Sequence, residues 1–425
     1  MRAVRTQKAK RKRQRAKPLG FDFTALSAGL GISLPSALCL GALVVQYFGP
    51  FAAMGVAQQA PYAAIDRAAV SYNGPGRDIG HDLKGSEIHI GLLAPFAGPR
   101  EAEGEALRHA AEMAIEQDNA ASLPGGRRLA LVARDESGPW GRASNEIVHM
   151  VFDDQAVAVI TSTDGASAHL AEQVGNKLGV PILTLSTDET TTEINIPWLF
   201  RLGPDDATVA GAFARDIYAA RGLRRVLLVT QSDHDGREGR DAFEKAAREV
   251  QGPARACLTV GLENADRDPS RADLEGMQAV VIWTESTVAA RLVPSIREVL
   301  PSVPIYLCRK AVEGDRSELA RPRCRACAVE DSGLWTVQTQ EGSDDRRARF
   351  VQCYRQRFGA DSSVAAAQTY DAVRVLAASL RRSGPNRARL RDVLAGISGF
   401  AGVSGVISFD HAGNDTSAVT LVQLK

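Results

Sequence analysis

From residue 87 onward, short apolar runs alternate with longer amphipathic stretches. Residues 88–93 form the first apolar run and predict a buried strand, which ends in a proline- and glycine-containing turn at 95–99. The next stretch, 101–119, carries its apolar residues at helical spacing and predicts an amphipathic helix. The alternation repeats, with further strands expected at 128–134, 156–161, 182–185, 225–230, 256–260, 279–283 and 305–307, and helices at 142–153, 167–178, 207–221, 236–250 and 286–299.

Strands that alternate with helices of this length predict an α/β fold. Such units connect parallel strands through right-handed crossovers, so the sheets are expected to be parallel and covered by helices. Ligands of these folds bind outside the carboxyl ends of the strands. The residues that directly follow each strand are therefore the first candidates for a functional site.

A long uncharged stretch precedes this pattern. No charged residue lies between Asp22 and Asp66, and the core of this stretch, 26–51, is apolar and long enough for a membrane-crossing helix of ~20 residues. The first seventeen residues hold nine Lys or Arg and no acid. A basic tip before an apolar run is typical of an export signal or a membrane anchor, so we assign residues 1–57 to that role. The alternative is a nucleic-acid-binding or nuclear-type tail before a buried helix.

Residues 58–86 contain several prolines and glycines and scattered charges, and they predict a linker to the folded body. The body itself is mildly acidic. The whole chain has 51 basic and 50 acidic residues, so removal of the nine basic residues of the tip leaves 42 against 50. An acidic body argues against nucleic acid as a partner, because such proteins present basic residues on a folded face.

Motifs of common enzyme classes are missing from the sequence. No Gly-x-Gly-x-x-Gly follows a predicted strand, no Gly-x-x-x-x-Gly-Lys-Ser/Thr occurs, and no Gly-x-Ser-x-Gly stands at a strand end. The seven histidines have no metal-ligand spacing. We therefore expect no catalytic residues, no metal site and no cofactor.

Several motifs in order resemble one protein family. They are GLLAPFAGP at 91–99, RDESG at 134–138, TYDAVRVLAASLRRSG at 369–384, and a Gly-x-x-Gly-x-Ile-x-Phe-Asp-x-x-Gly pattern at 402–413. Together, residues 87–425 are similar to the periplasmic solute-binding proteins of the leucine/isoleucine/valine type. The resemblance implies the type I fold, which has two lobes of doubly wound parallel sheet joined by three crossings.

The resemblance also implies boundaries between the lobes. We expect the crossings near residues 204, 334 and 404, which gives the first lobe residues 87–204 with 335–404. The second lobe would then hold residues 205–334 with 405–425.

The implied function is capture of an amino acid or a similar small polar ligand between the lobes, on the periplasmic or extracellular side of the cytoplasmic membrane. Permease subunits of an ABC importer are the implied partners, and the N-terminal segment would contact the membrane. The alternative is a cell-envelope regulatory or sensory domain of the same fold without transport, and an enzyme is the weakest option.

In the family, hydroxyls and backbone groups after two successive strands of one lobe hold the ligand. The corresponding residues here are Ser162, Thr163, Asp164 and Ser167, then Ser186, Thr187 and Asp188, with Phe96 in the turn after the first strand. Ser167 is expected near the start of a helix, where backbone N–H groups can bind an anion. The serines could instead only cap turns and helices.

The second lobe offers Asp235, Trp283 and Glu285 at the ends of strands. Asp235 could bind an ammonium group or cap the helix that starts at Gly236, and Trp283 could equally be a core residue. Because acids are numerous and no apolar wall is evident, the ligand is expected to differ from leucine. An amino acid is the default, with a polyamine, a urea-like compound or a peptide fragment as alternatives.

Six cysteines complete the candidate chemistry. Cys324 and Cys327 form a close pair. In an exported protein disulfides are the simplest expectation, a zinc site that includes Cys308 is a second, and free thiols are a third.

Overall fold

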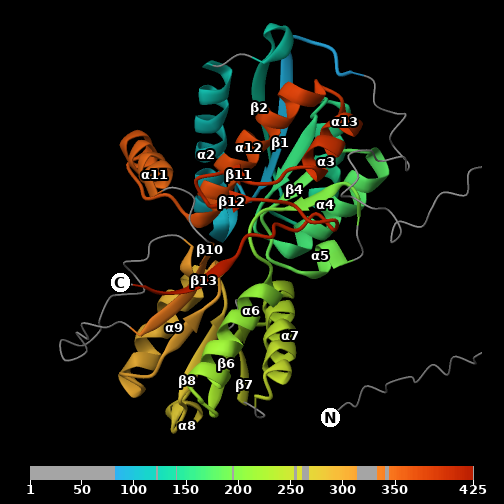
Figure 1. The fold of residues 1–425 in the computed structure, drawn as a ribbon. Coiled ribbons are helices and arrows are strands. Elements are labelled where there is room, and N and C mark those ends of the chain that lie inside the picture. The colour runs from blue at the N-terminus through green and yellow to red at the C-terminus, as the bar shows by residue number, and fades with distance from the viewer. Residues whose placement is uncertain are drawn as a thin grey trace, which may run out of the picture. The chain divides into compact units, whose positions relative to one another are not determined.

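The computed structural model describes residues 82–120, 123–139, 141–193, 196–252, 256–260, 268–313, 333–339 and 344–424. These residues form two α/β lobes, each with its own sheet and its own buried core (Figure 1). The predicted targeting segment 1–57, nearly all of the linker 58–86, and the pair Cys324 and Cys327 lie outside the described residues.

The first lobe is built on a five-stranded parallel sheet in the order β2-β1-β3-β4-β5. Its inner strands are largely apolar because helices cover both faces, which is usual for parallel sheets. Helices α2 and α12 cover one face, and α3 and α4 cover the other. The strands are β1 (Glu87–Ala94), β2 (Arg128–Asp135), β3 (Ala158–Thr161), β4 (Ile182–Thr184) and β5 (Leu199–Arg201), and the helices are α2 (Glu101–Ala120), α3 (Arg142–Phe152), α4 (Gly165–Leu178), α5 (Thr190–Glu193), α11 (Asp344–Phe358), α12 (Val364–Ser383) and α13 (Arg387–Ala395).

The second lobe holds a six-stranded sheet in the order β13-β10-β9-β8-β6-β7. Every neighbouring pair is parallel except β10 with β13, which is antiparallel. The expectation of purely parallel sheets is therefore corrected at this edge, where the chain returns from the first lobe in the opposite direction. The strands are β6 (Val226–Gln231), β7 (Ala256–Val260), β8 (Ala279–Trp283), β9 (Ile305–Leu307), β10 (Leu334–Thr339) and β13 (Val419–Leu424), and the helices are α6 (Asp206–Ala214), α7 (His234–Glu249), α8 (Arg271–Leu274) and α9 (Ser286–Val299).

Described residues lie on both sides of three passages of the chain between the lobes. The first lies between β5 and α6, where the sequence places it, near residue 204. The second follows β10, because this strand belongs to the second sheet, and so comes after Thr339 instead of near 334. The third follows Phe409 instead of 404, because Ile407 and Phe409 pack in the first core and the short strands β11 (Phe400–Ala401) and β12 (Val406–Ile407) pair there.

The first and third crossings are tied to each other at Gly203. Its backbone N–H donates to Oδ2 of Asp415 over 3.0 Å, and the N–H of Arg201 donates to the carbonyl oxygen of Gly413 over 2.8 Å. Gly203 has φ +84°, and a Cβ there would lie 2.1 Å from Nε2 of Gln368. Only glycine fits this position without strain, so the junction between the lobes depends on it.

Cys308 and Cys353 carry free thiols, so the disulfide expectation does not hold for these two residues. Cys308 is buried, and burial raises the pKa of its thiol to about 12. The thiol of Cys308 is therefore protonated and unreactive at neutral pH.

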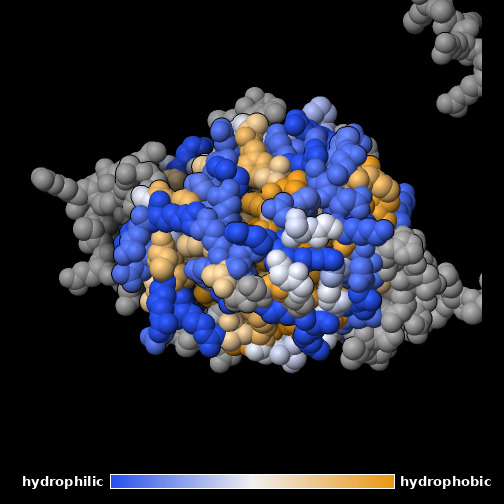
Figure 2. All heavy atoms as spheres, turned by 90° about the horizontal axis from the view of Figure 1, so that it is seen from above, coloured by the Kyte–Doolittle hydropathy of each residue, from blue (hydrophilic) through white to orange (hydrophobic). Residues whose placement is uncertain are grey.

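On the face shown in Figure 2, hydrophilic residues surround smaller hydrophobic areas. Among large apolar residues of the described chain, only Val148, Phe152 and Val406 are exposed. No described helix combines the length and the apolar character that a membrane crossing requires.

Candidate functional site

Charged side chains that follow strands of both sheets meet between the lobes. Arg100, Glu103 and Asp164 come from the first lobe, and Asp235, Glu285 and Lys310 come from the second. We call these six residues the interlobe cluster. Its position is the one expected for a ligand site of an α/β fold, because each residue lies beyond the carboxyl end of a parallel strand.

Arg100 is the centre of the first-lobe half. Its guanidinium donates to both oxygens of Glu103 over 2.9 Å each, and Nη1 donates to Oδ2 of Asp164 over 3.1 Å. Nε also lies 3.9 Å from Oε1 of Glu285 in the second lobe. Burial acts to lower the pKa of Arg100, but Glu103 and Asp164 outweigh it and raise this pKa, so the guanidinium stays charged.

Asp235 connects the two halves of the interlobe cluster. Its Oδ1 accepts from the backbone N–H of Gly165 over 3.1 Å, and its Oδ2 forms an ion pair with Lys310. Burial acts to lower the pKa of Lys310, but the carboxylates of Asp235, Asp164 and Glu103 together raise it, so the ammonium is charged. The contact between Gly165 and Asp235 joins the start of α4 in one lobe to the start of α7 in the other.

At the start of α4, where the sequence predicts an anion site, carboxylates of the protein accept from the backbone N–H groups. Asp164 is the N-cap and accepts from the N–H of Ser167 over 2.7 Å, while Asp235 takes the N–H of Gly165. Asp235 does not cap its own helix, because Asp233 does so by accepting from Gly236 over 2.8 Å. Of the two roles weighed for Asp235, capping is therefore excluded.

Carboxyl groups outnumber cations in the interlobe cluster by four to two. Burial raises the pKa of Asp235 and of Glu285, and Lys310 opposes the rise in both. In Glu103, by contrast, the charges of Arg100 and Lys310 overcome burial and lower the pKa. A ligand that adds a positive group would balance this excess of acid.

Glu136 lies behind the interlobe cluster, directly after β2. It is 9% exposed, Oγ of Ser162 donates to its Oε1 over 2.6 Å, and Nη1 of Arg100 is 3.9 Å from the same oxygen. Burial, with the nearby charge of Asp164, raises the pKa of Glu136 to about 8. This side chain is therefore mainly protonated at neutral pH.

The raised pKa of Glu136 predicts a pH-dependent stability. The native state holds this proton up to about pH 8, whereas the usual value is 4.5, so the stabilising contribution is complete below pH 4.5 and is lost as pH rises to 8. Glu136→Gln keeps the acceptor for Ser162 and has no proton to lose. Between pH 5 and 8, the melting temperature of this variant should rise steadily relative to that of the parent.

Glu101→Gln, which changes an exposed carboxyl on α2, is the matched control and should follow the parent at every pH. A constant difference between Glu136→Gln and the parent across this range would contradict the prediction.

Five of the sequence-predicted residues lie in or against the interlobe cluster. Asp164, Asp235 and Glu285 belong to it, Thr163 donates from Oγ1 to Oε1 of Glu103 over 2.7 Å, and Ser162 holds Glu136. Ser167 lies one turn away, with its backbone N–H bound to Asp164.

The other predicted residues have structural contacts in the present arrangement. Oγ of Ser186 accepts from the N–H of Asp188 over 3.2 Å within a turn, and the carbonyl oxygen of Thr187 accepts from Asp206 over 2.7 Å. Phe96 is half-buried against the first core. Trp283 is 4% exposed in the second core, which agrees with its alternative assignment as a core residue.

Sequence reasoning missed Arg100, Glu103, Glu136 and Lys310. The signal was present for three of them, because Glu136 directly follows β2 within the RDESG motif, Arg100 follows β1 by six residues and Lys310 follows β9 by three. Both cations lie outside the motifs that resemble the family.

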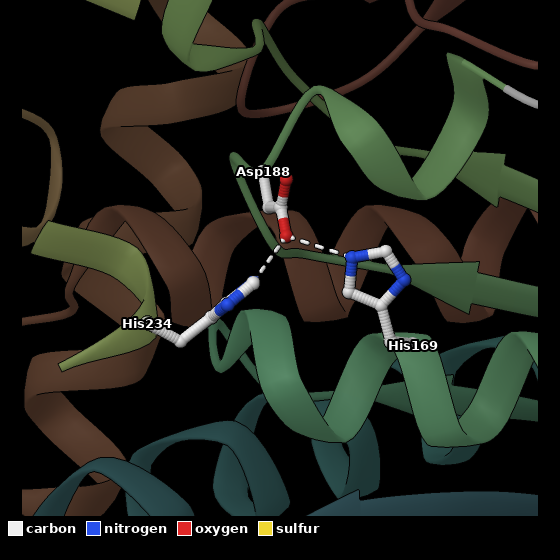
Figure 3. A group of neighbouring side chains, drawn as sticks. All are labelled: His169, Asp188 and His234. Carbon is white, nitrogen blue, oxygen red and sulfur yellow. Dashed lines mark hydrogen bonds and ion pairs between the residues drawn. The ribbon is translucent and has the colours of Figure 1, made fainter. Parts of the chain in front are cut away.

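A second group brings together Asp188 and two histidines (Figure 3). Nε2 of His169 lies 3.0 Å from Oδ2 of Asp188, and Nε2 of His234 lies 2.7 Å from the same oxygen. The hydrogen bond that His169 donates to Asp188, together with the nearby carboxylate of Glu172, raises the pKa of His169 to about 10, and the hydrogen bond that His234 donates to Asp188 raises the pKa of His234. The two histidines are 65 residues apart in sequence, so spacing along the chain gave no sign of this group.

Comparison with known proteins identifies the family. A model of the family described as periplasmic binding protein matches residues 87–425. An amino acid binding protein of Pseudomonas aeruginosa is 26% identical over 187 residues, which are 43% of this chain and 49% of that protein. Glutamate receptor 3.4 of Arabidopsis thaliana is 28% identical over 36% of this chain and 16% of the receptor. The match thus spans about half the length of the first curated relative and less of the second.

Solved structures show the same fold. The branched-chain amino acid transporter substrate-binding protein LivJ of Streptococcus pneumoniae, in complex with isoleucine, has a TM-score of 0.69 at 21% identity and covers 80% of this chain and 96% of its own. A solute-binding protein of an ABC transporter from Rhodopseudomonas palustris BisB5, in complex with 3,4-dihydroxybenzoic acid, has a TM-score of 0.68 at 15% identity. It covers 80% of this chain and 94% of its own. The two-lobed fold predicted from the sequence is thereby confirmed. The chain belongs to the periplasmic binding protein family, a non-enzymatic family, as its sequence motifs predicted.

Proposed function

We propose that this chain is an extracytoplasmic solute-binding protein that captures an amino acid, or a similar small polar ligand with a cationic group, between its lobes. The observation that carries the proposal is the interlobe cluster, in which charged groups from both lobes meet beyond the strand ends. Family membership supports the binding role, and the amino acid binding protein of P. aeruginosa supports the ligand class.

The charges of the interlobe cluster favour an amino acid over a purely anionic ligand. Four carboxyl groups face two cations, so a ligand that carries only a carboxylate would add to the excess of negative charge. An amino acid brings both an ammonium and a carboxylate. The planar fork of Arg100 holds both oxygens of Glu103 in this structure, and it can bind the carboxylate of the ligand through two parallel hydrogen bonds in exchange for Glu103.

The ammonium group of the amino acid ligand would have partners in both lobes. Asp164 from the first lobe, and Asp235 and Glu285 from the second, can accept from it. A ligand held in this way touches both lobes at once. It would therefore stabilise the arrangement in which the lobes are in contact, because only that arrangement offers all of its contacts.

Delivery to the permease of an ABC importer is the role that best fits such a receptor. The basic tip and the apolar stretch within residues 1–57 support a place on the outer side of the cytoplasmic membrane, either as a signal or as an anchor. The proposed protein therefore begins with this segment and the linker 58–86. Two lobes follow, and the chain passes from one to the other after Thr339 and again after Phe409.

A thermal-shift screen of the full chain tests the proposed ligand class. The probes are the twenty standard L-amino acids, putrescine, urea and benzoate, each at equal concentration. At 100 times its dissociation constant, a ligand stabilises the native state by ~2.7 kcal/mol, which is a measurable rise in melting temperature. We expect one or a few amino acids to produce this rise and benzoate to produce none. Stabilisation by benzoate alone would contradict the proposal.

A further inference from the structure

His169, Asp188 and His234 form a group that the amino acid site does not use. His169 lies on α4 and Asp188 follows β4, so both belong to the first lobe, whereas His234 is the first residue of α7 in the second lobe. In Figure 3 both imidazole rings point toward the carboxylate between them. Each residue offers one possible ligand atom, a ring nitrogen or a carboxylate oxygen. These three atoms lie within 4.8 Å of one another, close enough for one ion to contact all three.

Neighbouring side chains orient these three residues. Glu172 is 3% exposed, and its Oε2 lies 3.4 Å from Nδ1 of His169, the ring nitrogen that faces away from Asp188. Oδ1 of Asp188 accepts from the N–H of Thr190 over 2.9 Å and from its Oγ1 over 2.7 Å. Nε2 of His169 faces Oδ2 of Asp188 and also lies 3.0 Å from Oγ1 of Thr190.

Two imidazole nitrogens and one carboxylate oxygen are a common ligand set for zinc in proteins. A buried carboxylate that contacts the outer nitrogen of a ligating histidine is the usual support for such a site, because it fixes the orientation of the ring. We propose that His169, Asp188 and His234 bind a divalent transition metal of the zinc class across the two lobes. The metal takes the place of the protons that now link both Nε2 atoms to Asp188, and those protons pass to solvent.

The metal would lie beside the interlobe cluster but apart from it. Gly165 separates the two, since a Cβ there would lie 2.3 Å from Oδ1 of Asp235, 3.0 Å from Cδ2 of His234 and 3.1 Å from Oδ2 of Asp188. Because His234 comes from the second lobe, the metal holds the lobes together whether or not an amino acid is present. Metal binding should therefore stabilise the lobe contact by itself.

Metal binding is measured on the full chain after treatment with EDTA and dialysis, with Zn²⁺ as the probe in isothermal titration calorimetry. We expect one Zn²⁺ per chain and a rise in melting temperature. His234→Gln keeps a hydrogen-bond donor for Asp188 but removes the imidazole ligand, and it should abolish binding at concentrations that saturate the parent. Glu172→Gln should weaken binding by ~10–100-fold, as loss of a supporting carboxylate does.

His149→Gln is the matched control, because His149 also pairs with an aspartate, Asp153, over 2.6 Å, but is exposed and lies within one helix. This variant should bind Zn²⁺ like the parent. Melting temperatures without metal show that each variant is folded, and Co²⁺ in place of Zn²⁺ reports the ligand set through its visible absorption. Unchanged Zn²⁺ binding in folded His234→Gln, or no Zn²⁺ binding by the parent, would overturn the proposal.

The thermal-shift screen for amino acids is run in EDTA, so its outcome is independent of the metal. Loss of amino acid binding with Zn²⁺ binding intact would reject only the proposed ligand. The reverse result would reject only the metal site.

Discussion

Replacing Arg100 with glutamine is expected to weaken amino acid binding by about 10- to 100-fold. Hydrogen bonds to a charged group contribute ~1.5–3 kcal/mol each, and the guanidinium is the group best placed to hold the carboxylate of the ligand. The affinity of the amino acid found by the thermal-shift screen is measured by calorimetry for the parent and for Arg100→Gln.

Arg108→Gln is the control for this change. Arg108 lies on α2, is 38% exposed and pairs with Glu105 and Glu112, so its loss should leave the affinity unchanged. Arg100→Lys keeps the charge but loses the planar fork, and it should fall between the parent and Arg100→Gln. If folded Arg100→Gln binds as tightly as the parent, the carboxylate is held elsewhere.

Trp283→Ala is expected to lower the free energy of unfolding by ~3–5 kcal/mol, the usual loss for a buried tryptophan. Trp283 is 4% exposed, and its ring packs edge-on against Phe213 with 6.0 Å between centroids. Gly239 also leaves room for the indole, since a Cβ there would lie 2.0 Å from its Nε1. Unfolding in urea gives the measurement.

Trp335→Ala serves as the comparison. Trp335 is half-buried on β10, and the guanidinium carbon of Arg221 lies 4.5 Å from its ring centroid, so less buried area is lost. Its free energy of unfolding should fall by clearly less. A stable Trp283→Ala that no longer binds the amino acid would instead assign this ring to the ligand site, the other role that its place at a strand end had left open.

The elements that sequence predicted correctly are those with strong local patterns. β1 and α2 follow from an apolar run and from helical spacing, and both have nearly the predicted bounds. The strand β10 was missed because Leu334–Thr339 mixes polar and apolar residues, and its place in the second sheet depends on β9 and β13, which are distant in sequence. The second crossing was placed too early for the same reason.

In the candidate site, too, local sequence patterns predicted single residues, whereas contacts between distant residues were missed. Asp164 and Asp235 were found because each follows a predicted strand, and the structure brings them to either side of Gly165. The pairing of Lys310 with Asp235, and of His234 with Asp188, depends on how two lobes meet, which no local pattern encodes. Residue type and position in sequence could nominate single residues, but not the partners that determine their charge.

The packing of α12 on α2 determines the order in which the two lobes can fold. Tyr370 on α12 donates to Gln117 on α2, and 253 residues separate them, so one face of the first sheet stays uncovered until most of the chain has been made. The second lobe, continuous from α6 to β10, has most of its core much sooner. Distant contacts form slowly, because a long loop must close before they stabilise anything. The lobe that is synthesised first is therefore the one that finishes folding last, and its five strands are the part of the chain most exposed to aggregation during synthesis.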